Sequence, residues 1–387
     1  MISTIALPRE MRIGGGAVEQ LPQVVAGLGS RRPMVITDAF LAGSGLADRL
    51  VQNLLSADLD AVYFDGTVPD PTTDSLDEAL RAVRDHGADL LIGFGGGSPM
   101  DTAKALALLA VRGGTMRDYK APLRNDEPGL PVVAVPTTAG SGSEATQFTI
   151  ITDSASDEKM LCIGRAFLPV AAVIDYELTL SMPPRLTADT GIDALTHAVE
   201  AYVSRKNNPF ADGFSLQAIA TLGMNLRRVY ADGSDGPARA AMMLAASQAG
   251  IAFSNSSVAL VHGMSRPIGA HFHLAHGLSN AMLFPAVTRF SLGSATSRYA
   301  DCARAFGCAT LTDSDERAAG ELVETLGDLC RELAVPTPAS VGIDRDRWDG
   351  LVPLMARQAI ESGSPANNPR VPTAAEIETL YAEIYER

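Results

Sequence analysis

Short apolar segments alternate with helical patterns through the first 180 residues, and the alternation then stops. The segments between the apolar runs, at 43–56, 74–86 and 98–110, carry apolar residues at helical spacing. Strands separated by helices in this way predict a parallel sheet with helices on its faces. We expect helix 98–110 to begin with Ser98 as its N-cap and Pro99 at its first position. The predicted strands are 33–38, 61–66, 88–97, 131–140 and 170–177.

Beyond residue 181 nearly every segment has a period of 3.6 residues, and no further strand pattern occurs. Such a period predicts amphipathic helices that pack on one another. The chain is therefore expected to be α/β plus all-α, with an α/β domain at 1–181 and an all-helical domain at 182–387. Residues 362–373 read as a surface loop before the last helix. The predicted helices include 212–232, 236–254, 294–306, 314–333 and 373–385.

The charge balance excludes two classes of partner. The chain has a net charge of −14, and so acidic a surface repels phosphate backbones and anionic lipids. We therefore expect no nucleic-acid partner and no membrane partner. Four cysteines without a CxxC spacing favour a reducing compartment. With neither a signal-peptide pattern nor an apolar run of about 18 residues, the expected location is cytoplasmic.

Two glycine-rich loops follow predicted strands, which is where phosphate-binding loops occur. Glycines let the backbone approach a diphosphate, and the start of the next helix offers free N–H groups. Lys104 is expected either to reach the phosphates or to pair with Asp101 across the helix surface. A tight strand–helix turn without a ligand explains the first loop equally well, because the spacing is not GxGxxG. The candidate cofactor contacts in these loops and the helix between them are Gly95, Gly96, Gly97, Ser98, Asp101, Thr137, Thr138 and Ser141.

Asp38 ends the first predicted strand and bears on the choice of dinucleotide. A carboxylate at a strand end can accept hydrogen bonds from a ribose 2′-hydroxyl and repels a 2′-phosphate. It therefore favours NAD over NADP, although a solvated loop carboxylate explains Asp38 about as well.

The helical half contains a set of metal-ligand residue types. Asp193 and His197 lie four residues apart on one predicted helix face, while His262 and His276 are each followed by glycine. One carboxylate and three imidazoles suit Fe²⁺, Zn²⁺ or another divalent first-row metal, with room left for substrate. Any one of these histidines alone would be an ordinary core or surface residue.

With these residues assembled, the chain resembles the iron-containing (group III) alcohol dehydrogenase family. The matching motifs are GFGGGSPMDTAK, AVPTTAGSGSE, MPPRLTADTGIDALTHAVEAYVS and VHGMSRPIGAHFHLAHGLSNAMLFP. The resemblance implies a Rossmann-like NAD-binding domain, a helical domain holding Fe²⁺ or another divalent metal such as Zn²⁺ in the cleft between the two, and a homodimer or larger homo-oligomer. It implies ligation by Asp193, His197, His262 and His276. The dinucleotide positions that it implies are Asp38, Gly97, Ser98, Thr138, Ser141, Phe148, Lys159 and Leu178.

The chain departs from the family pattern at Arg266, where most members carry a histidine in HGMxHPxG. A guanidinium stays charged and cannot exchange protons near neutral pH. The proton relay then falls to His271, to our candidate His273, to water or to the cofactor ribose. Arg266 is expected either to clamp an anionic substrate group or to pair with an acid of the helical domain. Asp70 stands where the family commonly has asparagine.

The expected reaction is metal-dependent hydride transfer between NAD(H) and a primary alcohol or an aldehyde or ketone. Phe148 and Phe253 are candidates for the apolar side of the substrate pocket. The alternatives on a similar scaffold are enzymes like glycerol dehydrogenase, maleylacetate reductase or dehydroquinate synthase. A metal-dependent hydrolase is a further alternative from another class, and a non-catalytic role would leave the metal set and both loops unexplained.

Overall fold

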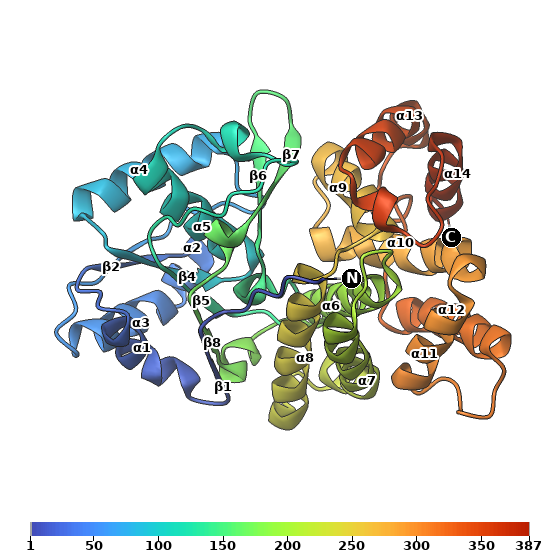
Figure 1. The fold of residues 1–387 in the computed structure, drawn as a ribbon, viewed down its shortest axis with the longest axis horizontal. Helices are drawn as coiled ribbons and strands as arrows, with labels where there is room; N and C mark the ends of the chain where they lie inside the picture. The colour runs from blue at the N-terminus through green and yellow to red at the C-terminus, as the bar shows by residue number, and fades with distance from the viewer. Residues whose placement is uncertain (1, 387) are drawn as a thin grey trace. The chain divides into compact units, whose positions relative to one another are not determined.

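The structure is a computed structural model that describes residues 2–386, and its backbone forms two compact units. One unit spans Thr4–Ser181 and the other begins at Met182. Figure 1 shows strands only in the first unit and helices throughout the second. Among the described residues, no helix is both long and apolar enough to cross a bilayer.

The first unit is built on a six-stranded sheet in which all neighbouring strands are parallel. The strand order is β1-β8-β5-β4-β2-β3. Its central strands are wholly buried, because their apolar residues meet helices on both faces. The strands are β1 (Glu10–Ile13), β2 (Pro33–Ile36), β3 (Val62–Phe64), β4 (Leu90–Gly95), β5 (Val132–Pro136) and β8 (Ala171–Ile174).

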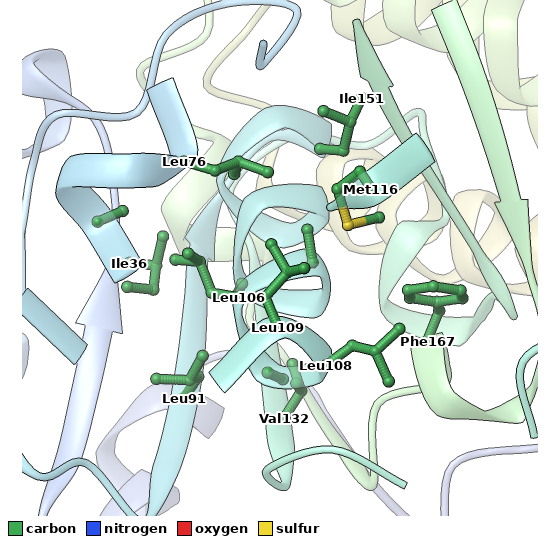
Figure 2. Close-up of a cluster of buried hydrophobic side chains, with 14 of the residues drawn as sticks. Ile36, Leu76, Leu91, Leu106, Leu108, Leu109, Met116, Val132, Ile151 and Phe167 are labelled. Atoms are coloured by element: carbon green, nitrogen blue, oxygen red, sulfur yellow. The ribbon is translucent and has the colours of Figure 1, made fainter. Parts of the chain in front are cut away.

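Helices cover the two faces of this sheet and form a core on each. Neighbouring residues of one strand point to opposite faces, so Leu91 enters one core and Ile92 the other. Figure 2 shows the first core, where Leu106 and Leu109 meet Leu76 and the sheet. The helices of this unit are α1 (Leu21–Gly27), α2 (Ala39–Gly43), α3 (Leu46–Leu55), α4 (Thr73–His86) and α5 (Gly97–Arg112).

The strand order creates a crevice-forming position at the carboxyl ends of β2 and β4. After β2 the chain continues to β3 on one side, and after β4 it continues to β5 on the other. Ligands of open parallel sheets bind where the chain diverges in this way. Asp38 follows β2, the glycine turn follows β4, and the loop from Thr137 follows β5. The sheet topology thus brings all three predicted ligand-binding segments to one edge.

The second unit is helical throughout its described residues. Helix α6 is buried along almost its whole length because α7, α8 and α10 pack around it. The helices are α6 (Pro184–Val203), α7 (Pro209–Ala231), α8 (Gly236–Ser254), α9 (Leu260–Phe272), α10 (His276–Ser291), α11 (Thr296–Phe306), α12 (Asp315–Glu332), α13 (Arg345–Glu361) and α14 (Ala374–Ile384).

The predicted α/β plus all-α fold class is confirmed, while two local predictions are wrong and one element was not predicted. Helix α5 has Gly96 as its N-cap, so Ser98 and Pro99 lie inside its first turn, where proline is tolerated. The sheet unit also contains an unpredicted antiparallel hairpin, β6 (Phe148–Asp153) and β7 (Glu158–Ile163). The segment 362–373 is not a plain surface loop, because its short helix η7 (Ser364–Asn367) is largely buried against α9.

Candidate functional site

Four side chains from three helices converge in the second unit. Asp193 and His197 come from α6, His262 from α9 and His276 from the first position of α10. One ligand atom of each lies within 4.8 Å of the other three. The Asp193 Oδ1 atom is 3.9, 3.7 and 3.8 Å from the Nε2 atoms of His197, His262 and His276, respectively.

The chemistry of these donors fits a divalent cation. Two atoms that each bind a metal at about 2.1 Å lie roughly 3–4 Å apart, which is the spacing found between Asp193 and the imidazoles. Burial acts to raise the pKa of Asp193, but the three surrounding imidazoles outweigh it and lower the pKa. A buried carboxylate that stays ionised can serve as a ligand to a cation, and one carboxylate with three imidazoles suits iron or zinc.

Glu200 fixes the orientation of His262. Its Oε2 atom is 2.6 Å from His262 Nδ1, so this nitrogen carries the hydrogen and Nε2 faces Asp193. The same carboxylate accepts hydrogen bonds from the backbone N–H groups of Ala259 (2.9 Å) and Val261 (2.6 Å) at the start of α9. Burial acts to lower the pKa of His262, but Glu200 and Asp193 together hold the pKa above its ordinary value.

Asn280 lies at the centre of the cluster. Its Nδ2 atom donates to Asp193 Oδ1 at 2.6 Å and is 3.2 Å from the Nε2 atoms of both His262 and His276. Within residues 2–386 its buried Oδ1 atom has no hydrogen-bond partner. Asn280 therefore touches three of the four candidate ligands from one position.

Phe253 and two glycines shape the walls of the cluster. The Phe253 ring stacks on His197 with centroids 4.3 Å apart, which places an apolar surface against that ligand. A side chain at Gly277 would come within 2.6 Å of the Asp189 carbonyl oxygen, and one at Gly263 within 2.7 Å of the Pro365 ring. Gly263, after His262, thus permits η7 to approach α9, and Gly277, after His276, permits α10 to approach α6. His276 lies on the exposed side of the cluster, and 35% of its side-chain surface is accessible to solvent.

Arg266 lies one helical turn after His262 and is buried, with 7% of its surface exposed. Its Nη1 atom donates to Ser364 Oγ at 3.1 Å, while its Nε has no partner among residues 2–386. Among residues 2–386, no carboxylate forms an ion pair with the Arg266 guanidinium. Burial lowers the pKa of Arg266 to about 10 against the opposing effect of Glu200, so the guanidinium stays charged at neutral pH.

The two other histidines near the cluster differ in their surroundings. His271 Nε2 is 2.8 Å from Gln358 Oε1, so that ring is engaged by α13. His273 is exposed and ends α9 in a left-handed conformation with φ of 53°. Of the two, His273 has the more accessible ring, three residues before His276.

The predicted dinucleotide positions of the sheet unit gather at the carboxyl edge of the sheet. The Thr137 N–H donates to the Gly95 carbonyl at 2.9 Å, which joins the two glycine-rich loops directly. Gly97 faces Ser141, and Gly96 faces Thr138. Asp38 Oδ1 accepts a hydrogen bond from Leu41 N at 3.0 Å and so caps α2. The positions that remain partly exposed are Asp38, Gly96, Gly97, Ser98, Asp101, Thr138, Ser141, Phe148, Lys159 and Leu178.

Asp101 and Lys104 differ from their predicted roles, because both turn inward. Asp101 accepts hydrogen bonds from Ser143 Oγ (2.8 Å) and Ile150 N (2.9 Å), so it holds the second loop and β6 rather than presenting a free carboxylate. Lys104 is fully buried, and its Nζ atom donates to Ser143 Oγ at 2.7 Å and to the Phe148 carbonyl at 2.9 Å. Burial lowers the pKa of Lys104 to about 8. The predicted pairing with Asp101 is present, because Lys104 Nζ lies 3.9 Å from Asp101 Oδ1. Lys104 is buried rather than on the helix surface, and its Nζ atom is engaged inside the unit instead of being free to reach a phosphate.

Two further positions from the family resemblance, Lys159 and Leu178, lie outside the glycine-rich loops. Lys159 of β7 forms an ion pair with Asp70 at 2.9 Å, and Asp70 has a left-handed backbone with φ of 51°. Aspartate and asparagine both tolerate that conformation, which accounts for the exchange of one for the other at this position. Leu178 lies in a short helix, η5 (Tyr176–Thr179), and packs against the core of the sheet unit.

Glu200 and Asn280 are the site residues that the sequence analysis missed. Glu200 lies seven residues after Asp193 on α6, and Asn280 lies four residues after His276 on α10. Both spacings put a polar side chain on the ligand-bearing face of a helix. The helical periodicity could therefore have found them.

Comparisons with known proteins point to one family. The family described as "Iron-containing alcohol dehydrogenase" matches residues 8–176, and "Fe-containing alcohol dehydrogenase family, C-terminal" matches residues 187–385. The NAD-dependent methanol dehydrogenase of Bacillus methanolicus is 36% identical over 372 residues, which cover 96% of this chain and 97% of that protein.

Solved structures of the same kind share the whole fold. A 1,3-propanediol oxidoreductase superposes with a TM-score of 0.94 at 31% identity and covers 100% of both chains. The sulfoacetaldehyde reductase of Bifidobacterium kashiwanohense, solved with NAD⁺, superposes with a TM-score of 0.88 at 25% identity, over 100% of this chain and 99% of that one.

Proposed function

The chain belongs to the iron-containing alcohol dehydrogenase family, and from this premise we propose that it interconverts a primary alcohol and its aldehyde with NAD(H). The observation that carries the proposal is the convergence of Asp193, His197, His262 and His276, with Glu200 and Asn280 in direct contact. The glycine-rich loops at the divergence of β2 and β4 supply the matching cofactor site.

We assign the two tasks to the two units. The unit Thr4–Ser181 would bind the dinucleotide, with its diphosphate at the start of α5, where the first N–H groups of the helix and Ser98 are accessible. Asp38, at the end of β2, would receive the adenosine ribose and select NAD over NADP. The unit from Met182 would hold the metal and the alcohol.

A bound Fe²⁺ or Zn²⁺ ion would supply Lewis-acid chemistry that polarises the alcohol or carbonyl oxygen. The protein does the rest. Glu200 holds the proton on His262 Nδ1 and so keeps Nε2 available as a ligand. Phe253 keeps water from one face of His197. The exposed ring of His273 would take the hydroxyl proton during alcohol oxidation and return it during aldehyde reduction.

We further propose that the enzyme works as a homo-oligomer in the cytoplasm. The four cysteines are all free thiols, which suits a reducing compartment. Light scattering of the purified protein at several concentrations would measure the size of the assembly, and a monomer at all concentrations would contradict this part of the proposal.

The proposal is tested with protein purified without chelators. Metal content is measured by mass spectrometry, and NADH oxidation is followed with a panel of short neutral aldehydes. His262→Ala should lose both bound metal and turnover, while His86→Ala, on α4 of the sheet unit, should keep both. NADH turnover by a metal-free protein, or none with any aldehyde despite stoichiometric metal, would overturn the proposal.

A further inference from the structure

Arg266 is a buried cation that the protein itself leaves largely unpartnered. Only Ser364 Oγ accepts a hydrogen bond from it within residues 2–386, and its Nε has no partner there. Arg239 shows what a buried structural arginine looks like in the same unit. Its three nitrogens donate to the Gly233 carbonyl, Thr187 Oγ1 and the Met182 carbonyl at 2.9, 2.9 and 3.2 Å. A buried charge without such partners is costly and needs a reason.

The helical geometry of α9 directs Arg266 between the metal cluster and η7. At 100° per residue, Arg266 lies about 40° around the helix from His262 and about 60° from Gly263. His262 faces Asp193, and Gly263 faces Pro365 of η7. The side chain in between touches Ser364 of η7 and is close enough to Glu200 for that carboxylate to act on its charge. Arg266 therefore lies beside the candidate metal site.

The charges around the site are not balanced without a further anion. Asp193 and Glu200 contribute two negative charges, which a divalent cation would neutralise, and Asp189 is already paired with Arg185 at 2.5 Å. Arg266 then remains as one excess positive charge in a buried setting. A planar guanidinium with free donors is suited to a carboxylate, sulfonate or phosphonate group.

From this we infer that Arg266 is a substrate-binding residue and that the preferred substrates are short alcohols and aldehydes with a negatively charged oxyanion group. The inference rests on the proposed dehydrogenase function and names its substrate class.

The test compares matched pairs of alcohols in NAD⁺ reduction by the metal-loaded enzyme. The pairs are 2-hydroxyethanesulfonate and 3-hydroxypropionate against 1-propanol and 1,3-propanediol. The wild type should prefer the anionic members in kcat/KM. Arg266→Gln should lower kcat/KM about 100-fold for the anionic alcohols, mainly through KM, and less than about threefold for the neutral ones. Arg266→Lys should keep part of the preference for anionic alcohols, because lysine retains the positive charge but lacks the paired N–H donors of the guanidinium.

Arg357→Gln is the matched control, because it removes one exposed positive charge from α13 and should leave the preference unchanged. A second readout does not require turnover. Ethanesulfonate should raise the melting temperature of wild-type protein in the absence of NAD, and 1-propanol at the same concentration should not. Arg266→Gln should lose that shift.

Three results would overturn the inference. One is equal use of neutral and anionic alcohols by the wild type, which needs no variant to fold. Another is an equal fall in kcat/KM for anionic and neutral alcohols in Arg266→Gln. The third is a rise in KM for NAD⁺ alone, which would assign the guanidinium to the cofactor. Absence of turnover with every alcohol would instead contradict the proposed function, so the two failures are distinguishable.

Discussion

Single residues decide how tightly the second unit can hold a metal. Asn280 contacts three of the four candidate ligands but is not itself counted among them. Groups that orient ligands typically change metal affinity by about 10- to 100-fold when removed. We therefore expect Asn280→Ala to lower metal affinity by that factor, measured by competition with a chelating dye.

Asn225→Ala provides the comparison for that experiment. Asn225 is also a buried helical asparagine, and its Nδ2 donates to the Thr221 carbonyl at 2.8 Å within its own helix, α7. The Asn225→Ala variant should be less stable than the wild type and should bind the metal with unchanged affinity. Equal metal affinity in Asn280→Ala and wild type would show that the amide plays no part in holding the cation.

His273 carries a second prediction at this scale. Its backbone is left-handed, and asparagine tolerates that conformation, so His273→Asn removes the imidazole without straining the chain. If the ring moves the proton, kcat should fall about 100-fold. Metal content and the KM for NAD⁺ should stay at the wild-type level. A wild-type kcat in His273→Asn would exclude His273 from proton transfer.

Among the secondary-structure elements, α5 and the loop after β5 behave as one piece. Lys104 and Asp101 of α5 hold Ser143, Phe148 and Ile150 through hydrogen bonds that are buried or partly buried. Lys104→Met should therefore loosen the loop, raise KM for NAD⁺ about tenfold or more and leave kcat at saturating NAD⁺ less affected. Lys206→Met changes an exposed lysine and should leave KM unchanged. A wild-type KM for NAD⁺ in Lys104→Met would refute this link.

The same lysine predicts how stability depends on pH. Burial lowers the pKa of Lys104 to about 8, below its ordinary value of 10.5, so between these values the folded protein binds fewer protons at this site than the unfolded chain. The free energy of unfolding should thus rise with pH from about 8 to 10.5, by a few kcal/mol at most, relative to Lys104→Met. Urea unfolding of both proteins at several pH values measures the difference. If the free energy of unfolding of the wild type falls or stays constant relative to that of Lys104→Met over this pH range, the prediction is wrong.

The elements differ in how far the sequence foretells them. Strands β2, β4, β5 and β8 are short apolar runs because helices bury both of their faces, and these runs were recognised. The edge strand β1 and the hairpin were missed, since their exposed positions carry charged residues such as Glu10 and Glu158. The four candidate ligands were found as two pairs of residues, each pair close together in the sequence. The inward hydrogen bonds of Lys104 could not be foreseen, because their acceptors lie 39 to 44 residues away in sequence.

The molecule as a whole divides its proposed tasks between two compact units. A ligand that binds only the folded state stabilises the unit that holds it, by about 2.7 kcal/mol at 100 times its Kd. We expect Zn²⁺ to raise the melting transition of the helical unit and NAD⁺ that of the sheet unit in calorimetry. One transition shifted equally by both ligands would instead show that the units unfold together.

The seating of η7 against α9 has an evolutionary consequence. Ser364 meets Arg266, and Pro365 fills the space that Gly263 leaves open, yet neither η7 residue is a candidate metal ligand. Mutations in this short segment can therefore alter which alcohols are accepted while the metal chemistry is inherited unchanged. Descendants of such an enzyme would diversify first in the residues between α13 and α14, and a library randomised there is the place to look for new specificities.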